Sequence, residues 1–312
     1  MREFVIRRFF FAIITIIGAT VVVFSLSRAA GNPILLYATP SGYGMSPDRI
    51  KALEHHLGLD RPLPEQYFIW LGQVIRGDLG QTLVQRKDVA TFLAARVPAT
   101  FELGLYAWVL ATIVGVPIGA LSAVRRGTVW DYLGRAFALL GQALPVFWVA
   151  IVFILLFAVH FRWFPVGTRG DHGWLDFKHV FLPMVTLAWS ALAGYMRLTR
   201  SGMLEVLDSE FVKLARAKGV SEWQVVWKHA FRNAMFQPLT ASALILVGFL
   251  NGVVLIEDIF AWPGLGSLAV TSVSNNDFPV LQAIVLFFTM AFVLVNFATD
   301  VLYAVIDPRV RY

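Results

Sequence analysis

The sequence predicts an all-α integral membrane protein with six transmembrane helices, cytoplasmic N- and C-termini, a small external helical segment and a cytoplasmic helix pair. Of its 312 residues, 58% are hydrophobic and only 15% are charged, whereas a soluble domain carries about a quarter charged residues. The mean hydropathy is +0.68. Six apolar stretches are separated by polar segments, and Lys and Arg gather in alternate segments. Lipid is therefore the expected solvent for much of the surface.

The first apolar stretch, 9–27, follows three arginines at positions 2, 7 and 8. At about 1.5 Å per residue it forms about 28 Å of helix, close to the hydrocarbon thickness of a bilayer. It is longer than the apolar region of a signal peptide, and no small-residue cleavage site follows it. We interpret it as an uncleaved span. The other predicted spans are 102–124, 136–160, 180–197, 239–257 and 280–306, with charged residues only near their ends.

The distribution of basic residues predicts the orientation. With the N-terminus inside, the inner segments contain fifteen Lys and Arg, and the short outer loops contain three. The remaining eight lie in the segment 28–100, which is too long to count in this rule. Both termini are therefore expected in the cytoplasm.

The outer segment 28–100 has helical patterning. A helix is predicted from Ser46-Pro47, with Ile50, Leu53 and Leu57 on one face and Gly58 at its end. A second helix is predicted from near Pro64 to Val74.

The cytoplasmic loop 198–238 is amphipathic. The sequence predicts one helix with an apolar stripe, then a left-handed turn at Gly219, then a second helix with a capping box of Ser221 and Gln224. The stripe consists of Leu204, Leu207, Phe211 and Leu214. Two interpretations fit this pattern: an interfacial helix pair on lipid headgroups, or a rigid lever that fits a cytoplasmic partner.

The stretches Glu210–Gly219 (EFVKLARAKG) and Lys228–Ala234 (KHAFRNA) resemble the signature loop of ATP-binding cassette importer permeases, closest to the dipeptide/oligopeptide/nickel family. Motifs along nearly the whole chain resemble the same family, in the subunit with the long first external segment. They are Leu57–Pro64, Gly77–Gly80, Trp163–Pro165, Trp262–Gly266, Asp277–Pro279 and Asp307–Tyr312.

The resemblance implies a single permease domain, 1–312, in a bacterial or archaeal cytoplasmic membrane, importing peptides or a similar solute such as a nickel chelate or glutathione. Its implied partners are a second homologous permease, two cytoplasmic ATPases that bind ATP and Mg²⁺, and an extracytoplasmic binding protein. The residues it places at the ATPase contact are Glu210, Leu214, Ala215, Ala217, Gly219, Val220 and Ser221.

Uncharged polar and aromatic residues inside the spans are candidates for the translocation path, although such residues also serve helix packing. They are Gln142, Trp189, Ser190, Ser242 and Asn251. The alternative functions are a passive channel, an ion-coupled secondary transporter and, more distantly, an intramembrane enzyme. The spans lack the mid-membrane acids and bases typical of proton-coupled transport, and we interpret Asp300 as a packed or paired end residue.

The sequence carries no phosphate-binding loop and no cysteine, so neither ATP hydrolysis nor thiol chemistry is expected on this chain. We expect no catalytic residue, no cofactor and no metal, because the pair His55-His56 beside Glu54 diverges on a helix and lacks a spaced ligand. The basic residues lie between apolar runs, which favours a membrane protein over a nucleic-acid-binding one.

Overall fold

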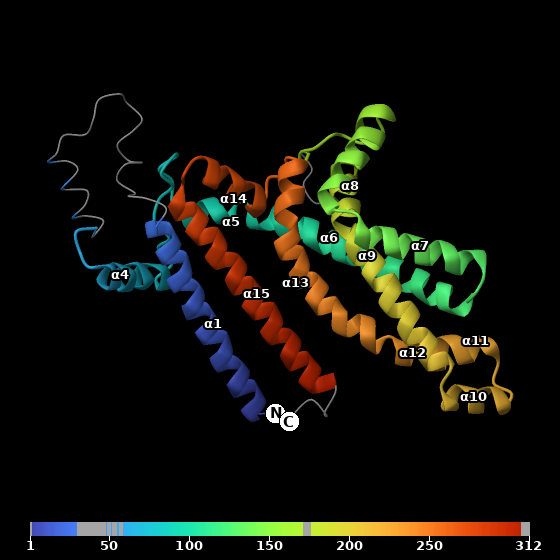
Figure 1. Ribbon diagram of the computed structural model, residues 1–312. Helices are drawn as coiled ribbons and strands as arrows, with labels where there is room; N and C mark the ends of the chain where they lie inside the picture. The colour runs from blue at the N-terminus through green and yellow to red at the C-terminus, as the bar shows by residue number, and fades with distance from the viewer. Residues whose placement is uncertain are drawn as a thin grey trace. The chain divides into compact units, whose positions relative to one another are not determined.

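The computed structural model describes residues 2–29, 48, 51, 55, 59–170 and 176–306. Within that part, the side chains of 2–4, 243, 247, 250–252 and 302–306 are not described. The described chain consists of helices joined by turns (Figure 1). It divides into two compact units, Met1–Pro98 with Gly264–Tyr312, and Ala99–Pro263. Each unit is described separately below.

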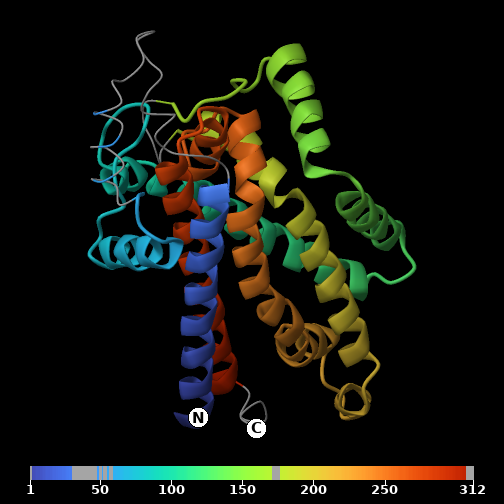
Figure 2. The same cartoon turned by 60° about the vertical axis from the view of Figure 1, so that its left-hand side comes forward.

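In the first unit, α1 (Arg2–Ala29) and α15 (Phe278–Ile306) run side by side, as the two views in Figures 1 and 2 show. Arg8 on α1 and Asp300 on α15 form an ion pair of 3.2 Å, so the prediction that Asp300 is a paired end residue is confirmed. Phe10 and Ile14 of α1 are 59% and 63% exposed. Such apolar exposure is typical of a helix that faces lipid.

The helix α4 (Leu63–Ile75) packs against α1. Thr20 of α1 and Tyr67 of α4 share a hydrogen bond of 2.9 Å, and the ring of Phe24 contacts those of Tyr67 and Trp70. The helix predicted from near Pro64 to Val74 is therefore confirmed. The helix predicted over 46–58 lies outside the described residues, apart from 48, 51 and 55.

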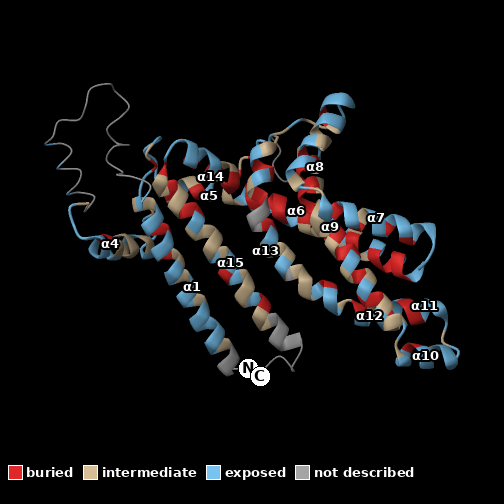
Figure 3. Cartoon of the chain, viewed as in Figure 1, coloured by how far each residue is buried: buried red, intermediate tan, exposed pale blue. Residues whose placement is uncertain are grey.

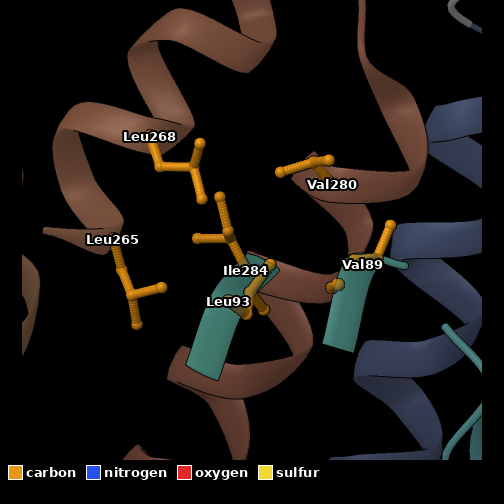
Figure 4. Packing of buried hydrophobic residues seen from close by; sticks show 7 residues of the cluster. Val89, Leu93, Leu265, Leu268, Val280 and Ile284 are labelled. Carbon is orange, nitrogen blue, oxygen red and sulfur yellow. The ribbon is translucent and has the colours of Figure 1, made fainter. Parts of the chain in front are cut away.

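A hydrophobic cluster joins the short helices α5 (Val89–Ala94) and α14 (Leu265–Ser274) to the start of α15. Figure 4 shows Val89 and Leu93 of α5 facing Leu265 and Leu268 of α14 and Val280 and Ile284 of α15. Asp277, just before α15, accepts a hydrogen bond of 3.1 Å from the backbone of Leu83. The last part of the segment 28–100 thus packs on the C-terminal part of the chain.

The second unit is built on α6 (Val97–Val124, all but its first two residues), α7 (Val129–Ala143), α9 (Phe177–Leu207) and α13 (Phe236–Ile259). Figure 3 shows buried residues along α6 and α9. Two glycines of α6 allow α9 to approach closely. A Cβ at Gly115 would lie 2.8 Å from the carbonyl oxygen of Leu192, and one at Gly119 would lie 2.6 Å from that of Met196. Only glycine fits at such backbone contacts.

The predicted span over 136–160 is not one straight helix. The chain bends by 107° between α7 and the helix that follows, α8 (Val146–Phe153), which continues as the π-helical segment η1 (Ile154–His160). The dark and light green helices meet at this bend in Figure 2. Leu144 is extended, with ψ 130°, because the ring of Pro145 disfavours a helical conformation in the residue before it.

Four described helical segments are long and apolar enough to cross a membrane: Val5–Ala29, Val89–Val124, Phe177–Leu207 and Phe278–Val301. The bent pair over 129–160 makes five if it counts as one span. The protein is therefore all-helical, with four or five candidate spans among the residues described. The predicted span 180–197 belongs to a helix of 31 residues, because α9 continues past the arginines at which the prediction ended.

The loop 198–238 differs from its predicted form in two details. The predicted first helix is broken, since α9 ends at Leu207 and the next helix, α10 (Glu210–Ala217), begins after Ser209. Leu204 and Leu207 therefore lie on a different helix from Phe211 and Leu214. After the Gly219 turn come α11 (Glu222–Gln224), the π-helical η3 (Val225–Ala230) and α12 (Phe231–Ala234). Ser221 is the N-cap of α11 but accepts no capping bond, so the capping-box prediction is wrong.

Candidate coupling surface and translocation path

The helix α10 and the turn after it project beyond one end of α9 (Figure 1). Ser209 precedes α10 in an extended conformation, which redirects the chain after α9. Val212 is the one residue of α10 that is fully buried. Phe211 and Leu214 are 47% and 56% exposed, and Trp223 on α11 is 71% exposed. The pair thus rests on one buried side chain and presents large apolar groups outward.

The turn at Gly219 has the left-handed conformation that the sequence predicts, with φ +78°. The backbone N–H of Val220 donates to the carbonyl of Ala215 at 3.2 Å, the bond that closes a Schellman-type helix end. Nothing lies within 4 Å of a Cβ built on Gly219. The requirement for glycine here is therefore one of backbone angle and not of space.

An ion pair spans the same turn. Arg216 at the end of α10 donates to Glu222 of α11 from Nε at 2.8 Å and from Nη2 at 3.4 Å. Because both partners are largely solvent-exposed, the pair adds little stability. It links the end of α10 to the start of α11 across the turn.

A hydrophobic cluster connects this projection to the long helices. Met203 of α9 and Ala120 and Ala123 of α6 pack with three residues of η3 and α12: Val226, Ala230 and Ala234. All six are buried. The segment after Gly219 is therefore packed against both α6 and α9.

The structure brings the predicted coupling residues together on α10 and the turn. Glu210, Leu214, Ala217, Gly219 and Ser221 are exposed, and Ala215 and Val220 are half-buried. Glu210 is engaged only by Lys213 of the same helix, at 2.8 Å. All seven are thus at the surface, where a partner could touch them.

The predicted path residues are more scattered. Gln142 is exposed near the end of α7, while Trp189 and Ser190 are half-buried on α9. The ring of Trp189 makes edge contacts with Phe137 and Phe153. The side chain of Asn251 lies outside the described residues.

Ser242 has a structural role that the sequence does not reveal. Its hydroxyl accepts hydrogen bonds from Trp108 Nε1 at 2.9 Å and from the Tyr195 hydroxyl at 2.8 Å. These bonds join α13 to α6 and to α9. Ser242 therefore makes the kind of helix-packing contact expected of a small polar residue in a span, and its place on the translocation path stays a prediction.

Polar contacts cluster at the beginning of α6. Glu102 is fully buried and pairs with Arg169, whose Nη2 lies 2.6 Å from Oε2. Thr100 donates to the buried Glu257 at 2.7 Å, and Trp262 Nε1 donates to the carbonyl of Ala99 at 2.8 Å. The sequence places Glu102 and Glu257 near span ends, but it gives no sign of their partners, which are 67 and 157 residues away in the chain.

A second buried pair lies toward the other end of α6. Asp131 of α7 accepts two hydrogen bonds from Arg200 of α9, one from Ser122 of α6 and one from the backbone of Gly127. This carboxylate binds three helical segments together. The sequence does not reveal that Asp131 is buried, because this residue lies among exposed arginines in a polar stretch.

Comparisons with known proteins agree with one another. The family profile described as "Binding-protein-dependent transport system inner membrane component" matches residues 115–312, and its N-terminal counterpart matches residues 1–104. The chain is 36% identical over 339 residues to the dipeptide transport system permease protein DppB of Escherichia coli K12, covering 100% of this chain and 99% of that one.

Two further similarities cover most of the chain. It is 36% identical over 319 residues to the oligopeptide transport system permease protein AppB of Bacillus subtilis, with both chains covered completely. A chain of the MetNI methionine ABC transporter, solved in inward-facing conformations, has a TM-score of 0.57 and 18% identity, covering 69% of this chain and 96% of that chain. At that identity the likeness concerns the fold alone.

Proposed function

Because this chain belongs to the family of binding-protein-dependent transport system inner membrane components, we propose that its cargo is a peptide and that it forms half of a transmembrane path. The chain is a permease subunit, a multi-pass protein of the bacterial inner membrane. It has no catalytic activity, and ATP is bound by a separate ATPase subunit. The observation that supports peptide cargo is the full-length similarity to DppB and AppB, two peptide permeases.

The proposed topology has six spans with both termini in the cytoplasm. The sixth span, besides the five candidate spans, is α13. Its 24 residues make a helix of about 36 Å at about 1.5 Å per residue. Its sequence is largely apolar from Leu239 to Ile256. The excess of Lys and Arg in the proposed inner segments supports this orientation. On this topology, both units act as one permease domain.

The proposed ATPase contact is the exposed face of α10 and the Gly219 turn. Three facts support docking to a protein. The Arg216–Glu222 ion pair spans the turn, and Val212 of α10 is buried. Phe211 and Leu214 are exposed. A rigid surface with apolar residues at its centre is typical of an interface.

The coupling mechanism follows from the buried cluster under this surface. Closure of the ATPases would push α10 and η3, and the contacts of Val226 and Ala230 with Met203 would pass that movement to α9 and α6. Such coupling requires each ATPase state to contact the surface differently. The proposed partners are a second, homologous permease, two ATPases and an extracytoplasmic binding protein.

The proposed function is tested on the assembled transporter in vesicles. We expect uptake of a di- or oligopeptide that needs both ATP and the binding protein, and ATP hydrolysis that rises when the binding protein carries peptide. Uptake that continues without ATP would indicate a passive channel, and uptake driven by an ion gradient alone would indicate a secondary transporter. Hydrolysis stimulated by a binding protein that carries a different solute would overturn the peptide assignment alone.

A further inference from the structure

A cavity of about 350 Å³ lies between α6, α7 and α9. Arginines at positions 135, 197 and 200 line it, together with the polar side chains of Gln142 and Ser201. No carboxylate is among the lining residues. Its volume is within the range of small-molecule sites, about 300–1,000 Å³.

The three arginines are not equally engaged. Arg200 is committed to the buried Asp131 by two hydrogen bonds. Neither Arg135 nor Arg197 has a carboxylate partner within the part of the chain that the structure describes. Arg135 lies 5.8 Å from the centre of the Tyr132 ring, a contact that leaves its charge uncompensated. Two cationic groups therefore border one cavity with no anion to offset them.

Part of the cavity lining is apolar. Ala138 and Leu139 of α7 and Met196 and Leu204 of α9 line it, and Leu139 is 71% exposed. A free phosphate ion would need the arginines but would leave this apolar surface unused. A molecule with an anionic head and apolar chains would use both.

The position of the cavity fits such a molecule, an argument that rests on the proposed topology. Arg135, Arg197 and Arg200 lie in the halves of α7 and α9 that are nearer the cytoplasm in that topology. The inner leaflet carries the anionic phospholipids, and basic pockets between spanning helices on that side bind their headgroups. Arginine suits phosphate because its planar fork donates two parallel hydrogen bonds.

We propose that this cavity binds the phosphate headgroup of an anionic phospholipid. Arg135 and Arg197 contact the phosphate, Gln142 and Ser201 add hydrogen bonds, and the apolar lining around Leu139 receives the start of the acyl chains. The bound lipid would connect α7 to α9, the helix that leads directly into the proposed ATPase contact.

The test is native mass spectrometry of the whole transporter, titrated with phosphatidylglycerol or phosphatidylcholine. We expect phosphatidylglycerol to bind the wild type and phosphatidylcholine to bind far more weakly. The double variant Arg135→Gln with Arg197→Gln should weaken phosphatidylglycerol binding about tenfold or more, since it removes charge-assisted hydrogen bonds. The matched control is Arg232→Gln, an exposed arginine on α12 that does not line the cavity.

Unchanged phosphatidylglycerol binding by the double variant would overturn the proposal, as would equal binding of the two lipids by the wild type. The comparison of the two lipids on the wild type can overturn the proposal even if the variant fails to assemble. If glycerol phosphate, which has no acyl chains, competes as strongly as the lipid, the site is one for free phosphate and the lipid assignment is wrong. Lipid binding is measured without transport. An arginine-dependent lipid site in a complex that moves no peptide would refute the proposed cargo and leave this inference intact.

Discussion

Arg200 on α9 clasps Asp131 on α7 through two parallel hydrogen bonds, from Nε to Oδ1 at 2.7 Å and from Nη2 to Oδ2 at 3.1 Å. Asp131 is 2% exposed and Arg200 is 23% exposed. The remaining bonds to this carboxylate come from Ser122 and Gly127, so it has a donor on each side. The pair fixes α7 and the α6–α7 turn to α9.

Removing the charge of Asp131 should destabilise the subunit. Asp131→Asn leaves Arg200 without its counter-ion, and breaking a buried pair in this way costs about 3–5 kcal/mol. We expect the lower end of that range because Arg200 is partly exposed. Thermal unfolding of the detergent-solubilised transporter measures the loss. The control is Asp208→Asn, whose partner Arg126 lies 3.6 Å away in an exposed pair, and this change should cost less than about 1 kcal/mol. Equal effects of the two variants would contradict the prediction.

The turn at Gly219 should tolerate asparagine but not valine. A β-branched residue at φ +78° is strained, by an amount on the order of 1–3 kcal/mol, whereas asparagine adopts this region more readily. No atom of this chain lies within 4 Å of the added Cβ, so the Cβ itself meets no crowding here. We expect Gly219→Val to reach normal abundance but to lose assembly with the ATPases, and Gly219→Asn to keep it. Co-purification is the measurement, and full assembly of the valine variant would refute a role for the turn geometry.

Ala217 should be sensitive to bulk and charge. It is exposed beside the Gly219 turn, where a small side chain lets a partner surface approach. Ala217→Glu is expected to lower ATP hydrolysis stimulated by loaded binding protein at least tenfold, because a buried unpaired charge costs more than about 1.4 kcal/mol. Ala217→Ser, a small change at the same site, should retain stimulation. If the glutamate variant is stimulated normally, the lipid-headgroup interpretation of this helix pair gains support.

Ser242 is expected to act on stability. Ser242→Ala leaves Trp108 Nε1 and the Tyr195 hydroxyl without their acceptor, and each unsatisfied buried donor costs about 1–3 kcal/mol. We expect a lower unfolding temperature with a smaller effect on peptide affinity. Ser190→Ala, at the other serine predicted for the path, should unfold near the wild-type temperature. A change in peptide uptake with unchanged stability would instead support a place for Ser242 on the translocation path.

The orientation is tested by labelling, which the absence of native cysteine makes simple. Val84→Cys, 57% exposed after α4, should react with a membrane-impermeant maleimide from outside. Asn233→Cys, exposed on α12, should react only after the membrane is opened. Labelling of both from the same side would refute the six-span topology.

Sequence reasoning succeeded where the signal is local. Gly219 predicts its own left-handed turn, and Pro64 marks the start of α4, because backbone preferences act within a few residues. Sequence reasoning missed the bend at Pro145, where hydropathy outweighed proline: an apolar run is compatible with two helices at 107° as well as with one span. It was wrong at Ser209, because periodicity continues across a break when both helices carry apolar residues.

The tertiary pairs could not be predicted from one sequence. Nothing local distinguishes Asp131 from any exposed acid, since its burial depends on Arg200, 69 residues away. The same holds for Ser242, whose two donors belong to other helices. The seven coupling residues were placed by family resemblance, and their position on one exposed surface is compatible with it, although only the assembled complex tests the contact.

The glycine contacts of α6 affect how force passes through this unit. Because Gly115 and Gly119 bring the α6 backbone against α9, a side chain at either position would collide with the α9 backbone. The two helices are therefore in close backbone contact along this stretch. In the proposed coupling mechanism, little of a movement that begins at α10 would be lost between these two helices. A methyl group at Gly119 would push the two helices apart. Less of a movement at α10 would then reach the far end of α6.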